Sequence, residues 1–80
     1  MPLFLLQHQH APAECAAAFA AWLGFDSPLR GGEAASTCLD GGHAVWWQVE
    51  AANRQAALAL LPPFVAHRTE AIAVRDVQIP

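Results

Sequence analysis

Runs of apolar residues, continuous in some segments and alternating in others, predict four strands. In residues 3–10 both alternating sets of positions begin apolar, which is typical of a strand covered on both faces. Residues 43–50 have the same character, so we expect these two segments to be the central strands. Residues 36–39 are more polar and suit an edge strand, and residues 70–79 close the chain as a fourth strand rich in β-branched side chains.

Two further segments carry helical signals. Pro12 suits a first helical turn, and Gly24 supplies the stop for the helix between them. The apolar stripe of this helix consists of Cys15, Phe19, Trp22 and Leu23. Asn53 can cap a second helix, which Pro62-Pro63 ends because proline disfavours helix in the residue before it. The turn-rich connection over residues 25–35 is long for so small a domain, and we expect a functional or a mobile loop there.

The order strand, helix, strand, strand, helix, strand predicts one α+β domain over residues 1–80. Asp40-Gly41-Gly42 lies between the second and third strands, and Asp-Gly between two β-like runs favours a hairpin. The fold expected is a ferredoxin-like βαββαβ sandwich, a four-stranded antiparallel sheet with two helices on one face. The other face should carry Trp46 or Trp47 together with several aliphatic residues, because adjacent strand residues point to opposite faces.

The composition indicates that this domain has a protein partner. Hydrophobic residues make up 55% of the chain and charged residues only 14%, against about 25% charged in an average soluble domain. A domain of this length also has a marginal core of its own. We therefore expect a homodimer in which the open faces of two sheets pack together and bury their apolar side chains.

The pattern resembles the dimeric α/β-barrel superfamily, and in particular its small stand-alone bacterial members. The resemblance rests on the order of elements, on the Asp40-Gly41-Gly42 hairpin and on the Val49-Glu50-Ala51 passage from a strand toward the second helix. It implies a homodimer that forms a barrel from two sheets. The superfamily includes cofactor-independent monooxygenases, lactone isomerases, haem-dependent enzymes and ligand- or metal-binding proteins, and no catalytic residue carries over from any of them by motif.

Charge and apolar run lengths exclude several classes of partner. The formal net charge is −3, there is no lysine, and the four arginines are scattered, so we expect no nucleic-acid partner. No stretch approaches the roughly 20 apolar residues of a membrane span, and no basic leader precedes the apolar start. We expect a soluble, cytoplasmic protein with no membrane partner. Cys15 and Cys38 are too few for a disulfide framework, and we interpret both as small buried hydrophobic residues.

Histidine is the side chain here that titrates closest to neutral pH. His8 and His10 are two residues apart on a strand, hence on one face and about 6 to 7 Å from each other. We expect the predicted topology to bring further polar residues to the same edge, namely Glu50, His67 and Glu70, with Glu14 and Cys15 nearby. His43 follows the hairpin turn, and we expect it at the far end of the sheet, outside this cluster.

Imidazole groups combined with a carboxylate or a thiolate are suitable ligands for zinc, nickel or copper. The predicted cluster allows a site of His8, His10 and His67 with Glu50 or Glu70 as a further ligand. None of the usual zinc spacings, such as His-Glu-x-x-His or Cys-x-x-Cys, is present. The alternative that the two strand histidines form a solvated pair, or one at the rim of the core, therefore stays open.

The same residues also suit an enzyme. His8 or His10 would act as a general base at the mouth of a pocket, with arginines positioning an anionic substrate. The residues expected to line this pocket are Trp22, Trp47, Phe64, Arg68 and Arg75. The alternative is that the aromatic side chains belong to the core and the arginine stems lie over them.

Three hypotheses follow for the function. The first is a homodimeric binding domain that takes a small-molecule ligand or a transition metal in the barrel or at the histidine-rich edge. The second is a cofactor-independent enzyme of the monooxygenase or isomerase kind. The third is a structural interaction module.

Overall fold

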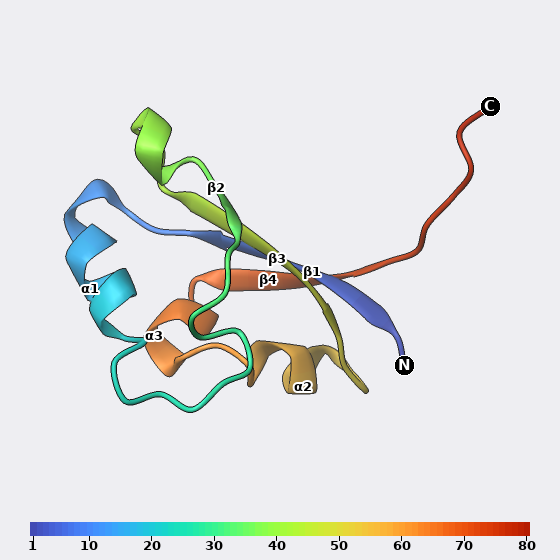
Figure 1. Ribbon diagram of the computed structural model, residues 1–80, viewed down its shortest axis with the longest axis horizontal. Helices are drawn as coiled ribbons and strands as arrows, with labels where there is room; N and C mark the ends of the chain where they lie inside the picture. The colour runs from blue at the N-terminus through green and yellow to red at the C-terminus, as the bar shows by residue number, and fades with distance from the viewer.

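In a computed structural model that describes residues 1–80, the chain forms one four-stranded antiparallel sheet with helices on one side (Figure 1). The strands are β1 (Leu3–Gln9), β2 (Ala35–Ser36), β3 (Ala44–Glu50) and β4 (Thr69–Val74), in the order β2-β3-β1-β4. The first and third strands are therefore central, as the sequence predicts. The fold is α+β and has the layout of a ferredoxin-like sandwich.

Strand β1 runs antiparallel to both of its neighbours, and this register decides which side chains meet. Leu6 pairs with Trp47 on one side and with Ala71 on the other, and His8 pairs with Val45 and Thr69. Because side chains alternate along a strand, every second residue of β1 points toward the helices and the rest toward the open face.

Three short helices cover the helix side of the sheet: α1 (Cys15–Ala20), α2 (Arg54–Leu58) and α3 (Pro63–Ala66). A 3₁₀ turn over Pro12–Glu14 leads into α1, and Asn53 caps α2 by accepting a hydrogen bond from the backbone N–H of Ala56 at 2.8 Å. The sequence prediction missed α3. Proline at the first helical position needs no hydrogen-bond donor, so Pro63 begins a new helix where we expected only an end.

Strands β2 and β4 are shorter than predicted. Residues 38–40 form a 3₁₀ turn rather than the end of a strand, and Gly41 then adopts the left-handed conformation with φ of 83°. Residues 75–80 extend away from the sheet without strand pairing (Figure 1). Residues 25–34, predicted as a loop, contain no helix or strand.

The core lies between the sheet and the helices. Leu6 and Ala57 are completely buried, and Val65 and Leu61 are 1% and 2% exposed. They belong to one cluster of eight buried residues from β1, β3, β4, the helices and their connections. None of the helices has the length and apolar character needed to cross a membrane.

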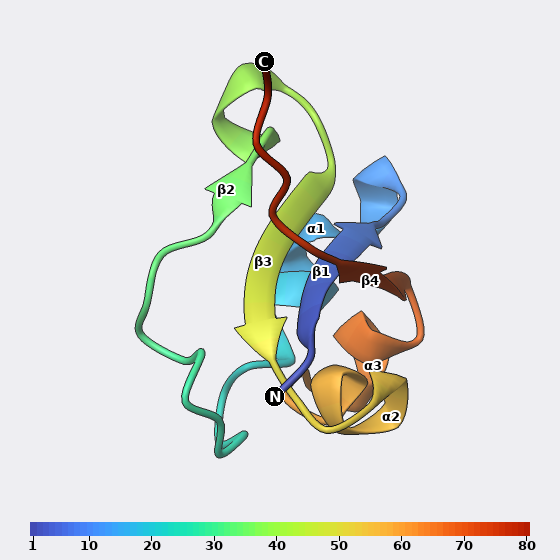
Figure 2. The same cartoon turned by 90° about the vertical axis from the view of Figure 1, so that its right-hand side faces the viewer.

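The open face of the sheet turns toward the viewer in Figure 2. It carries apolar residues, as the sequence predicts. Trp46 lies on this face, with its indole Nε1 donating to Gln7 Oε1 at 3.4 Å, whereas Trp47 faces the helices. The aliphatic residues of this face are half-buried, and they are Leu3, Leu5, Ile72 and Val74. Pairing with a second copy through this face stays a prediction. Sedimentation should show a dimer at micromolar concentration, and a monomer would contradict it.

Candidate metal and ligand site

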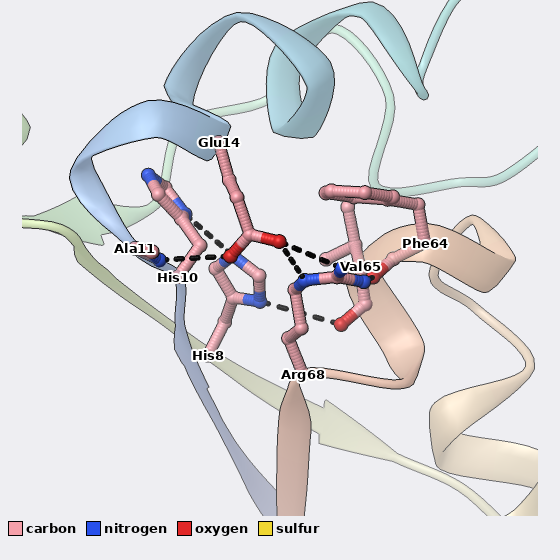
Figure 3. A network of polar contacts seen from close by, with 7 residues as sticks. All are labelled: His8, His10, Ala11, Glu14, Phe64, Val65 and Arg68. Atoms are coloured by element: carbon pink, nitrogen blue, oxygen red, sulfur yellow. Dashed lines mark hydrogen bonds and ion pairs between the residues drawn. The ribbon is translucent and has the colours of Figure 1, made fainter.

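Two histidines at the end of β1 form the centre of the site. His8 is 1% exposed and His10 is 7% exposed, so both are buried although they are polar. The alternation of β1 turns both toward the helix side, where they lie close to Val65 and Arg68 of the α3 region (Figure 3). Buried polar groups are costly unless they find hydrogen-bond partners, so their contacts show what the pair can do.

A chain of hydrogen bonds assigns the tautomer of each ring. The hydroxyl of Thr69 donates to the carbonyl of Val65 at 2.7 Å, and His8 Nδ1 lies 3.3 Å from the same carbonyl and 3.1 Å from the Thr69 oxygen. A carbonyl only accepts, so we assign the proton of His8 to Nδ1, and its Nε2 is then an acceptor. His10 Nδ1 lies 2.8 Å from that Nε2 and must donate to it.

This tautomer determines the state of the other ring nitrogen of His10, Nε2. With its proton on Nδ1, a neutral His10 carries a lone pair on Nε2. This Nε2 atom is buried and has no hydrogen-bond partner. An imidazole lone pair held in this way, by a hydrogen bond from the opposite ring nitrogen, is the form in which histidine binds metals.

Electrostatics favour the neutral form of His8. Burial lowers the pKa of His8 below its ordinary value of 6.5, and the nearby His10 lowers it further. The hydrogen bond to the Val65 carbonyl opposes this shift without outweighing it. A neutral His8 has one donor and one acceptor, as the chain of hydrogen bonds requires.

A thiol and a third imidazole stand next to His10. Cys15 Sγ lies 3.2 Å from His43 Nδ1, and the ring centroids of His10 and His43 are 5.6 Å apart. The backbone N–H of His10 donates to the carbonyl of His43 at 3.1 Å, which ties the end of β1 to the residue before β3. One ligand atom from each of the three side chains lies within 4.8 Å of the other two.

These three side chains fit a metal ion in their donor types and nearly fit one in their spacing. Zinc–sulfur and zinc–nitrogen bonds of about 2.3 and 2.0 Å place one sulfur and two nitrogen ligands roughly 3.3 to 3.5 Å apart in a tetrahedron. The His10, Cys15 and His43 group must therefore close by about 1.4 Å at its widest separation to bind zinc. Cys15 and His43 are half-buried, so side-chain rotations can supply this movement.

The positions predicted for Glu50 and His43 are both wrong, and for the same reason. Strand β3 is antiparallel to β1, which pairs Glu50 with Leu3 at the opposite end of the sheet from His10. The same direction brings His43, expected far away, next to His10 and into the cluster. The expected cluster requires the first and third strands to be parallel, whereas neighbouring strands of this sheet are antiparallel.

His67 and Glu70 also lie outside the cluster. Both are exposed, and Glu70 pairs with Gln7 on the open face of the sheet, opposite the face that carries His8. His67 follows α3 and lines a shallow surface depression together with Glu70. The side chains whose ligand atoms converge are instead His10, Cys15 and His43.

The predicted pocket exists with a different lining. A cavity of about 250 Å³ lies between α1, the loop over residues 25–34 and the sheet. Trp22 and Trp47 line it as predicted, with ring centroids 5.8 Å apart. The other apolar wall residues are Phe19, Leu29, Val45 and Val65. His8 and His10 also reach this cavity.

Phe64, Arg68 and Arg75 do not line the cavity. The guanidinium carbon of Arg68 lies 3.6 Å from the centre of the Phe64 ring, in a cation–π contact beside the histidines. Arg75 lies beyond β4, in a surface depression at the other end of the sheet. Neither arginine is therefore placed to hold a substrate in this cavity.

Arg68 instead connects two helical segments. It forms an ion pair of 2.7 Å with Glu14 and also donates to the carbonyl of Phe64 at 2.9 Å (Figure 3). The hydrogen bond from Arg68 lowers the pKa of Glu14, and the bond that Glu14 accepts from the backbone N–H of Ala11 acts in the same direction. This contact fixes the turn before α1, from which Cys15 follows, against α3.

No protein-family model, no curated protein and no solved structure matches this chain. Sequence reasoning expected Cys15 near His10 but did not include it in the ligand set, and it placed His43 outside the cluster. The signal that could have found His43 is the hairpin itself. Antiparallel pairing of β3 with β1 places the start of the third strand beside the end of the first.

Proposed function

We propose that this domain binds a transition-metal ion through His10, Cys15 and His43. The observation that carries the proposal is the buried Nε2 of His10, which has no hydrogen-bond partner and belongs to a side chain that lies next to a thiol and a second imidazole. A buried polar atom without a partner is costly, and a bound cation would remove that cost.

The types of donor restrict the metal. A thiolate with two imidazoles suits zinc, copper or nickel and is a poor set for magnesium or calcium, which prefer oxygen ligands. Three protein ligands leave one tetrahedral position open, the arrangement of metal sites that bind a further molecule. The metal would also displace the thiol proton of Cys15, so its binding releases a proton.

A second candidate function is a cofactor-independent enzyme that uses His10 as a general base. The observation in its favour is that His10 lines the 250 Å³ cavity while its Nε2 has no partner. The two functions differ in what a chelator does. A chelator removes the metal from a metal site and abolishes its function, whereas it does not affect a histidine that acts as a base alone.

Zinc binding by untagged protein under reducing conditions tests the proposal. Equilibrium dialysis should give about one equivalent for the wild type and less than about a tenth for His43→Ala, because two remaining ligands hold zinc weakly. His67→Ala is the matched control, since His67 is exposed and outside the group, and it should bind like the wild type. Equal losses in both variants, or no zinc in the wild type, would contradict the proposal.

A further inference from the structure

The cavity beside the metal ligands has the size and lining of a small-molecule site. The cavity lies between the sheet and α1 and has a volume of about 250 Å³. No charged side chain lines it. An apolar cavity of about 150 Å³ is enough for benzene, so this one takes roughly ten non-hydrogen atoms. A charged group in its apolar part would have no partner, which favours an uncharged molecule.

The lining divides the cavity into an aromatic body and a polar end. Trp22 and Trp47 meet at an interplanar angle of 45°, so their rings present both a face and an edge to an aromatic guest. The buried polar side chains of the wall are His8 and His10, and the acceptor of His8 is already used by His10. His10 thus belongs both to the cavity wall and to the three metal ligands.

We propose that the cavity binds a small uncharged phenol of one ring, whose oxygen takes the open fourth position on the metal. The ring packs against Trp22 and Trp47, whose own rings are in contact, and the oxygen lies at the His10 end. On coordination the hydroxyl proton passes to the solvent and the oxygen forms the bond to the metal. This inference rests on the proposed function, because without a metal the oxygen has no ion to bind.

The probe is 4-ethylphenol, which has nine non-hydrogen atoms, added to the cobalt-loaded protein. Cobalt stands in for zinc because its visible absorption reports a change of ligand. We expect saturable binding of one molecule by calorimetry, together with a shift of the cobalt bands. The comparison probe is 4-ethylanisole, in which a methyl group replaces the hydroxyl proton. It should bind at least about tenfold more weakly and leave the cobalt bands unchanged, because an oxygen ligand of this kind must lose its proton to bind the metal.

Ala34→Trp places a bulky side chain at the cavity wall, and Ala34 is exposed, so the fold should tolerate it. This variant should weaken 4-ethylphenol binding at least about tenfold and leave the cobalt affinity unchanged, because filling a cavity removes the space for its guest. Ala35→Trp is the matched control. Ala35 is also exposed and does not line the cavity, so this variant should bind the phenol like the wild type.

The outcomes separate this inference from the metal proposal. Cobalt-loaded protein that does not bind 4-ethylphenol overturns the inference and leaves the metal site standing. Phenol binding that Ala34→Trp does not weaken, or that leaves the cobalt bands unchanged, also overturns it. If the metal proposal fails, the protein shows no cobalt spectrum before any phenol is added. That result overturns this inference as well.

Discussion

Cys15→Ser should lower the zinc affinity of the domain by more than about 100-fold, which is the upper end of the loss caused by removing an outer partner of a ligand. Cys15 supplies the only sulfur atom of the group, at 3.2 Å from His43 Nδ1. A serine hydroxyl is a much poorer ligand, since it must lose a far more weakly acidic proton. Competition of the protein with a chromophoric chelator measures the difference.

Cys38→Ser is the matched control for this substitution. Cys38 is the other free cysteine, is half-buried like Cys15, and lies outside the His10, Cys15 and His43 group. Its replacement should change the zinc affinity by no more than about twofold, because no ligand is lost. If the two serine variants lose affinity equally, or if neither does, then Cys15 is not a ligand.

His8→Leu should weaken zinc binding by about 10- to 100-fold although His8 is not a ligand, because it removes the acceptor that fixes the tautomer of His10. The acceptor is His8 Nε2, which lies 2.8 Å from His10 Nδ1. His8→Gln places an amide oxygen near the position of that nitrogen and should recover most of the affinity. Chelator competition gives the affinities, and thermal unfolding reports the stability of each variant.

Recovery by glutamine separates a positioning role from a packing role. His8 is 1% exposed, so both variants should lose stability through changed packing. Leucine is the better hydrophobic substitute, and a purely structural role for His8 would favour it in both measurements. Zinc affinity that follows stability across the two variants, with leucine at least as tight as glutamine, would refute the positioning role.

The sequence was sufficient to predict the order of the sheet, because the central strands have a distinct pattern. Residues 3–10 and 43–50 are apolar on both faces, and only central strands are covered on both faces. The α3 helix was not predicted because the same two residues, Pro62-Pro63, indicate both the end of one helix and the first turn of the next. Strand β4 ends at Val74, which pairs with Leu3, the first residue of its only sheet neighbour β1.

The candidate site could be predicted only in part. The spacing of His8 and His10 correctly indicates one face of a strand, and both are at the site. The remaining partners depend on strand direction. In the antiparallel sheet that the sequence predicts, the start of the third strand lies beside the end of the first, and the expected cluster did not follow that direction. Once β3 is placed antiparallel to β1, Glu50 leaves the cluster and His43 enters it.

The hydrogen-bond chain through His8 could also not be predicted from the sequence. It depends on the carbonyl of Val65 at the end of α3, which accepts from the backbone N–H of Arg68 and from the Thr69 hydroxyl, while His8 Nδ1 lies within reach of both the carbonyl and the hydroxyl. A helix that was not predicted thus supplies the acceptor that sets the tautomers of both histidines.

X-ray absorption spectroscopy of the zinc-loaded, untagged protein tests the central claim most directly, since it reports the ligands of the metal themselves. A site of His10, Cys15 and His43 predicts one sulfur at about 2.3 Å and two imidazole nitrogens at about 2.0 to 2.1 Å from zinc. A first shell of oxygen and nitrogen without sulfur would contradict the account.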